Sequence, residues 1–286
     1  MDSSADDAQV ATAWNLHYLA CTCVTLATFW TYDYISSLHE EWTFLLQSRW
    51  TKLKALYIVA RYIPFFFIAT DLYMIFTPNE NPNKCRMLIN IYSCLGVISL
   101  TCSECFFILR TYALWNKNRI VLVAMLSTLF AIIVSFIGIW FTAVATSDVI
   151  TSTIPGTVGC YRSSSSVYFF VSFLLLFVLA VVLVFLTLIP IIQSWQIGKG
   201  RLHSILVKHN MFYYACSLFL SAVNVLTPVL SSYISINFFE RFQALILAIL
   251  ATRMHLDLWR NNWHAHESDA LECISMSDSL PADPTV

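Results

Sequence analysis

The sequence predicts an all-α integral membrane protein: a bundle of seven transmembrane helices, with the N-terminus outside and the C-terminus in the cytoplasm. Hydrophobic residues make up 58% of the chain and charged residues 12%, against an ordinary charged share of about 25%. The mean hydropathy is +0.68. A soluble domain of 286 residues could not bury the apolar surface that this composition implies. The net charge of -1 gives no indication of a nucleic-acid partner.

A membrane-spanning helix needs about 20 mostly apolar residues. Blocks of this kind predict spanning helices at 14–33, 53–76, 87–112, 120–146, 167–192, 211–233 and 237–258. They form a transmembrane domain over 13–260. Residues 1–12 form a short acidic extracellular segment whose lack of Lys and Arg argues against a signal peptide. The polar composition of 261–286 predicts a disordered cytoplasmic tail.

Lysine and arginine determine the predicted orientation, because they concentrate on the cytoplasmic side of a membrane protein. One side of the predicted bundle carries Arg49, Lys52, Lys54, Arg110, Lys117, Arg119, Lys199, Arg201, Lys208, Arg253 and Arg260. The other side carries only Lys84, Arg86, Arg162 and Arg241. This bias puts the N-terminus outside and the C-terminus inside, which requires an odd number of crossings.

The first predicted cytoplasmic loop contains an amphipathic stretch over 38–50. Apolar side chains fall near one helical face, at Leu38, Trp42, Leu45, Leu46 and Trp50. The pattern predicts a short helix lying in the headgroup region. The alternative is a loop that two tryptophans anchor at the interface.

Several short runs of the sequence form a distinctive set: Tyr32-Asp33-Tyr34, Glu40-Glu41, Trp50, Arg61-Tyr62-Ile63-Pro64, Leu109-Arg110-Thr111-Tyr112-Ala113-Leu114 and Arg253-Met254-His255-Leu256-Asp257-Leu258. Together they resemble a large fungal, mostly basidiomycete, family of multi-pass membrane proteins that carries a domain of unknown function. The resemblance covers all seven predicted helices in order. It implies a seven-helix architecture and no particular activity.

The positions of Cys85, Cys160 and Arg110 carry a looser resemblance, to the seven-helix layout of G-protein-coupled receptors. Cys85 and Cys160 occupy the places of the disulfide of those receptors, and Arg110 lies at the cytoplasmic end of the third helix. The departures are Leu109, where those receptors usually have an acid, and a seventh helix without Asn-Pro-x-x-Tyr. Convergence on a seven-helix layout would give the same likeness.

A disulfide between Cys85 and Cys160 is predicted, because both lie on the oxidising side in this topology. It would tie the 147–166 loop to the start of the third helix and contribute about 3 kcal/mol. A tied loop would form a lid over an extracellular cavity. The alternative is two free surface thiols.

Arg61 and Glu104 are predicted to form an intramembrane ion pair. Each lies about eight residues, or ~12 Å, from the cytoplasmic end of its helix, and either charge alone in lipid would cost several kcal/mol. The pair would serve as a structural clamp, or else as a switch or as the polar floor of a binding site. Alternatively, Arg61 extends towards the headgroups.

Three further residues are candidates for a ligand-binding or switch role. Asp71 would recognise a cationic ligand or hydrogen-bond a neighbouring helix. Arg110 is either a positive anchor or a contact for a cytoplasmic partner. Asp33 would pair with a loop cation such as Arg49 or Lys52.

The leading hypothesis is a receptor-like or sensory protein of the plasma membrane. A small-molecule ligand would enter from outside between helices two, three and seven, and a signalling partner would bind in the cytoplasm. A small-solute transporter or channel is the first alternative, and an intramembrane lipid-acting enzyme the second. No catalytic or metal-binding set converges in the sequence, since the CxxC of Cys102 and Cys105 lacks a second ligand pair. An enzyme is therefore not predicted, nor is a cofactor.

Overall fold

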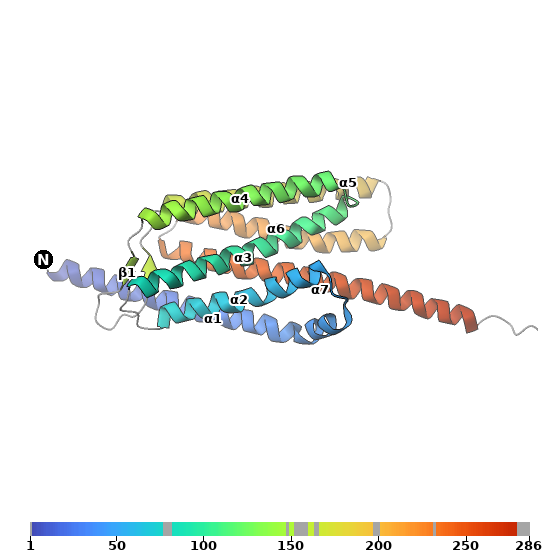
Figure 1. Ribbon diagram of the computed structural model, residues 1–286, viewed down its shortest axis with the longest axis horizontal. Helices are drawn as coiled ribbons and strands as arrows, with labels where there is room; N and C mark the ends of the chain where they lie inside the picture. Colours follow the sequence, from blue (N-terminus) through green and yellow to red (C-terminus); the bar gives the residue numbers. More distant parts are fainter. Residues whose placement is uncertain are drawn as a thin grey trace, which may run out of the picture.

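A computed structural model describes residues 2–76, 82–146, 149–151, 160–162, 166–196, 201–230 and 233–278. Within these ranges the chain forms seven helices and a small two-stranded sheet (Figure 1). Their bounds are α1 Asp2–Gln47, α2 Lys52–Phe76, α3 Pro82–Leu114, α4 Arg119–Thr146, β1 Val149–Thr151, β2 Cys160–Arg162, α5 Ser166–Gln196, α6 Arg201–Leu230 and α7 Tyr233–Asp278.

Successive helices run in opposite directions, so the connections gather at two ends of the bundle (Figure 1). We call the end that carries β1 and β2 the hairpin end, and the opposite end, where α7 extends beyond the other helices, the tail end. The two strands are antiparallel, with Val149 opposite Arg162 and Thr151 opposite Cys160. β1 lies against α3, so the strand pair is held at the start of that helix.

Local chemistry sets several helix ends. The Thr51 hydroxyl accepts a hydrogen bond from the backbone N–H of Lys54, and Asn118 Oδ1 accepts one from Ile120. Both are N-caps that satisfy a free donor at the start of a helix. Asn116 and Lys117 have φ of 52° and 60°, the left-handed conformation that commonly ends a helix.

Within the described residues, five helices contain a stretch long and apolar enough to cross a membrane: Lys52–Phe76, Asn83–Leu114, Arg119–Ile139, Phe173–Pro190 and Phe238–Arg260. The protein is therefore a multi-pass membrane protein in contact with the lipid bilayer. The apolar stretch of α6 is shorter, over Met211–Thr227. α1 is less apolar because it contains several threonines and the acids Asp33, Glu40 and Glu41.

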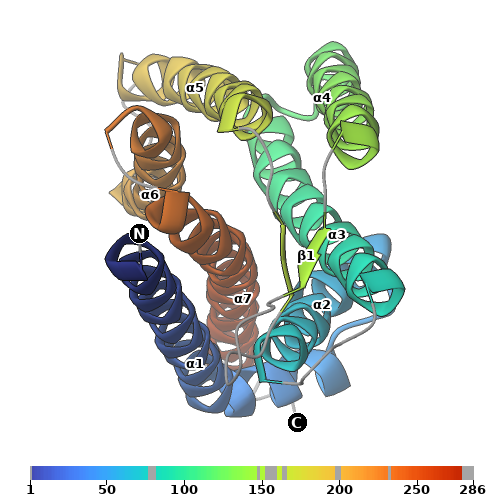
Figure 2. The ribbon, with the colours of Figure 1, turned by 90° about the vertical axis from the view of Figure 1, so that its left-hand side faces the viewer.

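Helix α7 lies at the centre of the bundle and contacts α1, α2, α3 and α6 (Figure 2). The buried side chains of the described helices form two hydrophobic cores. Leu245 and Ala248 of α7 belong to one of them, and Met254 belongs to the other. α4 is peripheral, since only Met125 and Leu129 are buried in the described part of that helix. The exposed side of α4 is an apolar stripe suited to lipid, formed by Ile120, Val123, Leu126, Phe130, Val134, Ile137 and Phe141.

Helix α1 is longer than the sequence predicts. It is one helix from Asp2 to Gln47, where the sequence predicts an extracellular segment, a spanning helix over 14–33 and a separate interface helix over 38–50. No Gly or Pro interrupts residues 2–47, so nothing in the chain ends the helix earlier. Leu38, Trp42 and Leu46 are exposed on its last turns, which agrees with contact at the membrane surface.

Helix α7 is also longer than predicted, because it continues to Asp278 where the sequence predicts a disordered tail from 261. Residues 261–278 contain no Gly or Pro and several good helix formers, including Ala, Leu and Glu. The first proline after the helix is Pro281. The polar composition of residues 261–278 is therefore compatible with a helix.

Candidate functional site

A buried group of charged residues joins three helices near the tail end. We call it the tail-end cluster: Asp33, Ser37 and Glu41 of α1, Arg61 of α2 and Arg253 of α7. Asp33, Ser37 and Glu41 are four residues apart and so lie on one face of α1. Arg61 Nη1 donates to Asp33 Oδ2 over 2.7 Å, and Nη2 donates to Ser37 Oγ over 2.5 Å. Arg61 also forms an ion pair with Glu41.

The second arginine of the cluster brings in α7. Arg253 Nε donates to Asp33 Oδ1 over 3.0 Å, and Arg253 Nη2 donates to Ser36 Oγ over 2.6 Å. The cluster thus balances two arginines with two carboxylates. Arg61 is 1% exposed and Glu41 2%, and the Arg61 guanidinium lies 5.3 Å from the ring centres of both Trp30 and Tyr34. This buried network joins three helices, although Arg61 Nε has no hydrogen-bond partner among the described residues.

The structure does not bring Arg61 and Glu104 together. Arg61 faces α1, whereas Glu104 lies among side chains of α4 and α5. The prediction matched the depth of the two residues but ended the first helix at residue 33. It therefore missed Ser37 and Glu41 as members of the cluster, and it assigned Asp33 to Arg49 or Lys52 in place of Arg61 and Arg253. The four-residue spacing of Asp33, Ser37 and Glu41 was the signal in the sequence that could have found them.

A second buried pair lies nearer the hairpin end. Asp71 of α2 accepts hydrogen bonds from Arg241 of α7 over 2.9 Å and from the Cys23 thiol of α1 over 3.2 Å. The Arg241 guanidinium lies 5.7 Å from the ring centre of Tyr92 on α3. Of the two roles predicted for Asp71, these contacts match a bond to a neighbouring helix.

The tail end of α3 is held by hydroxyl groups. Thr111 Oγ1 lies 3.1 Å from Thr187 Oγ1 of α5 and 3.0 Å from the Tyr214 hydroxyl of α6. The neighbouring Arg110 is partly buried, and no ion pair within the described ranges involves it. Both predicted roles for Arg110, as an anchor or as a partner contact, remain predictions.

Cys85 is fully buried at the start of α3. The free thiols found in the part of the chain that the structure describes are Cys21, Cys23, Cys94, Cys102, Cys105 and Cys216. The side chain of Cys160 lies outside the described residues, although its backbone begins β2. The pairing of Cys85 with Cys160 therefore stays a prediction.

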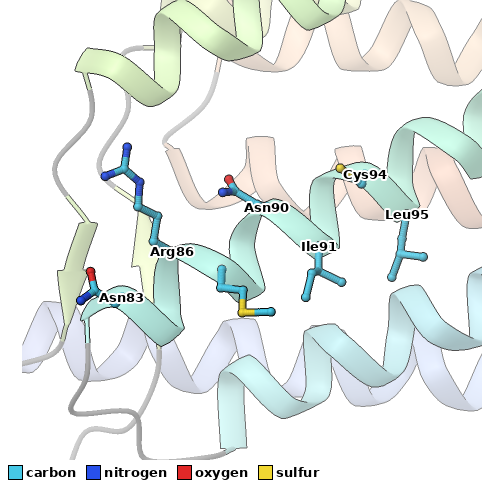
Figure 3. Close-up of a pocket in the computed structure, with 7 residues that line it drawn as sticks. Asn83, Arg86, Asn90, Ile91, Cys94 and Leu95 are labelled. Atoms are coloured by element: carbon cyan, nitrogen blue, oxygen red, sulfur yellow. The ribbon is translucent and has the colours of Figure 1, made fainter.

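A surface cleft of about 490 Å³ runs along α3 at the hairpin end. The residues that line it are spaced three and four apart, so they form one stripe on the helix: Asn83, Arg86, Met87, Asn90, Ile91, Cys94 and Leu95. In Figure 3, Arg86 and Asn90 extend to one side of this stripe, and Ile91 and Leu95 extend to the other. The surface of the cleft is therefore mainly apolar, and the polar side chains of Arg86 and Asn90 lie along one margin.

Residues 21–66 match the model of a family of unknown function, DUF6533. The matched segment contains Asp33, Ser37, Glu41 and Arg61, which are the α1 and α2 members of the tail-end cluster. No curated protein matches the chain. Over the residues whose placement is described, no three His, Cys, Asp or Glu side chains lie together as a metal site would require.

Proposed function

We propose that this protein is a receptor-like or sensory protein of the plasma membrane, with seven membrane crossings. It binds a small molecule in the cleft along α3 and acts on a cytoplasmic partner without catalysing a reaction. The observation that supports this best is the cleft itself, since its volume of about 490 Å³ falls in the range of small-molecule sites, about 300–1,000 Å³.

The proposed orientation places the hairpin end outside. It is supported by the basic residues, most of which lie towards the tail end in the sequence order of the helices. In this orientation the cleft opens to the extracellular side. Its position on α3 fits the predicted ligand entry at helices two, three and seven only in part, because the lining residues that the structure describes come from α3.

The chemistry of the cleft favours an amphiphilic anion. Arg86 is exposed, and a guanidinium binds a carboxylate through two parallel hydrogen bonds. Asn90 adds an amide donor. Met87, Ile91 and Leu95 provide an apolar surface for a hydrocarbon chain. A medium-chain carboxylate has both the charge and the chain that this stripe matches.

Decanoate is a suitable probe for this proposal. We expect it to raise the melting temperature of the purified protein, because a ligand of the native state alone stabilises it by about 2.7 kcal/mol at 100 times its Kd. Arg86→Gln should remove most of the shift. Lys84→Gln is the matched control: Lys84 is an exposed basic residue two positions away that does not line the cleft, so this variant should respond like the wild type.

Equal shifts in Arg86→Gln and Lys84→Gln would refute the proposed carboxylate site, as would no shift in the wild type. A transporter would instead accumulate labelled decanoate inside sealed vesicles. Accumulation that depends on the protein would contradict a purely receptor-like role.

The proposal includes a disulfide between Cys85 and Cys160, which would fix the strand pair to the start of α3. The chain has nine cysteines. If the bridge exists, Cys85→Ser releases the thiol of Cys160, and the unfolded, unreduced variant shows one more free thiol than the wild type. A count one lower than the wild type would exclude the bridge. Thiol titration in denaturant gives this number directly.

A further inference from the structure

Glu104 is a buried acid, and within the described residues its Oε2 atom has no partner. Its side chain is 3% exposed, and its Oε2 makes no hydrogen bond. No ion pair of Glu104 occurs within the described helices. A carboxyl group at this depth is costly in a membrane protein unless something binds it, and such residues commonly mark a functional site.

The Glu104 side chain borders a small cavity between α3, α4 and α5. The cavity holds about 30 Å³, which is room for one group the size of a water molecule. Apart from Glu104 and Thr101, the side chains around it are apolar: Val97, Leu100, Leu129, Ile132, Ile133, Phe136 and Leu176. The carboxyl is therefore the one charged group that the cavity offers among these residues.

The cavity adjoins the lipid. Val97, Thr101, Ile132, Ile133 and Phe136 are only partly buried, and α4 has few buried residues of its own. The exposed apolar stripe of α4 extends the apolar lining of the cavity onto the outer surface of the bundle. A molecule dissolved in the bilayer can thus reach Glu104 sideways, between α3 and α4, without passing through the cleft at the hairpin end.

We propose that this cavity binds the amino group of a lipophilic amine, whose hydrocarbon chain lies against α3 and α4 in the bilayer. An ammonium group is compact enough for the cavity and supplies donors to both oxygens of Glu104. If a neutral amine meets the protonated carboxyl, the proton moves from the carboxyl oxygen to the amine nitrogen, and no other reactant is needed. An anion would be repelled, and an alcohol could offer only one neutral hydrogen bond.

The test uses the full chain in nanodiscs of phosphatidylcholine, with dodecylamine as the probe and 1-dodecanol as its uncharged counterpart. We expect dodecylamine to raise the melting temperature of the wild type well beyond the effect of 1-dodecanol. Glu104→Gln should need at least about tenfold more dodecylamine for the same shift, because a hydrogen bond to a charged group is lost. The control Glu40→Gln removes an exposed acid and should respond like the wild type.

A second variant keeps the carboxyl and removes the space. Ile133→Trp should fill the cavity and abolish the response to dodecylamine while Glu104 is still present. If Glu104→Gln does not fold, Ile133→Trp alone tests whether dodecylamine binds in the cavity. An unchanged dodecylamine response in either Glu104→Gln or Ile133→Trp would overturn the proposal. So would equal responses of the wild type to dodecylamine and 1-dodecanol.

Discussion

Replacing Arg61 with methionine is expected to lower the free energy of unfolding by about 3–5 kcal/mol, the range for breaking a buried ion pair. Methionine keeps much of the length of the side chain but removes the charge. Asp33 and Glu41 would then lie buried on the same face of α1, where Asp33 keeps only Arg253 and Glu41 loses its ion pair. Unfolding in a titration of denaturing detergent, followed by circular dichroism, measures the loss.

Arg260→Met is the matched control for this prediction. Arg260 also forms ion pairs, with Glu40 and Asp257, but its side chain is 47% exposed. Exposed pairs contribute about 0–1 kcal/mol, so the control should lose no more than that. Similar losses in the two variants would show that the tail-end cluster does not hold α1, α2 and α7 together.

Replacing Asp71 with leucine is expected to cost about 3–5 kcal/mol as well, because it leaves the guanidinium of Arg241 buried without its carboxylate. The Cys23 thiol also loses its acceptor. The double variant Asp71→Leu with Arg241→Met should recover much of this stability, since an apolar pair of similar volume can replace a buried ion pair at little cost.

A double-mutant cycle over Asp71 and Arg241 measures this coupling. Residues in direct contact show coupling energies of about 0.5–3 kcal/mol, whereas independent sites add within about 0.5 kcal/mol. Strictly additive losses would mean that the two side chains do not interact in the membrane. That result would contradict the ion pair between Asp71 and Arg241 that joins α2 to α7 near the hairpin end.

The helices could be predicted well from hydropathy because each apolar block is bounded by polar or turn-forming residues. The predicted 120–146 matches α4 at Arg119–Thr146, and 53–76 matches α2 at Lys52–Phe76. The ends of α1 and α7 could not be found this way. Hydropathy marks where a chain leaves the lipid, and a helix without Gly or Pro continues past that point.

The partners of the buried charges were harder to predict, because equal depth does not tell which helices face each other. Arg61 and Glu104 lie at matching depths, yet they point to opposite sides of the bundle. Arg241 was counted only among the positive residues of the outer side, although it pairs with Asp71 across 170 positions of sequence. Helix packing, which a single sequence does not show, decides such pairs.

The most direct test of the central claim, an odd number of crossings with the basic connections inside, is the location of the two ends of the chain. A short epitope tag before Met1 and another after Val286 can be detected by antibodies on intact and permeabilised cells. Seven crossings predict that the first tag is labelled on intact cells and the second only after permeabilisation. Detection of both tags from the same compartment would contradict the account.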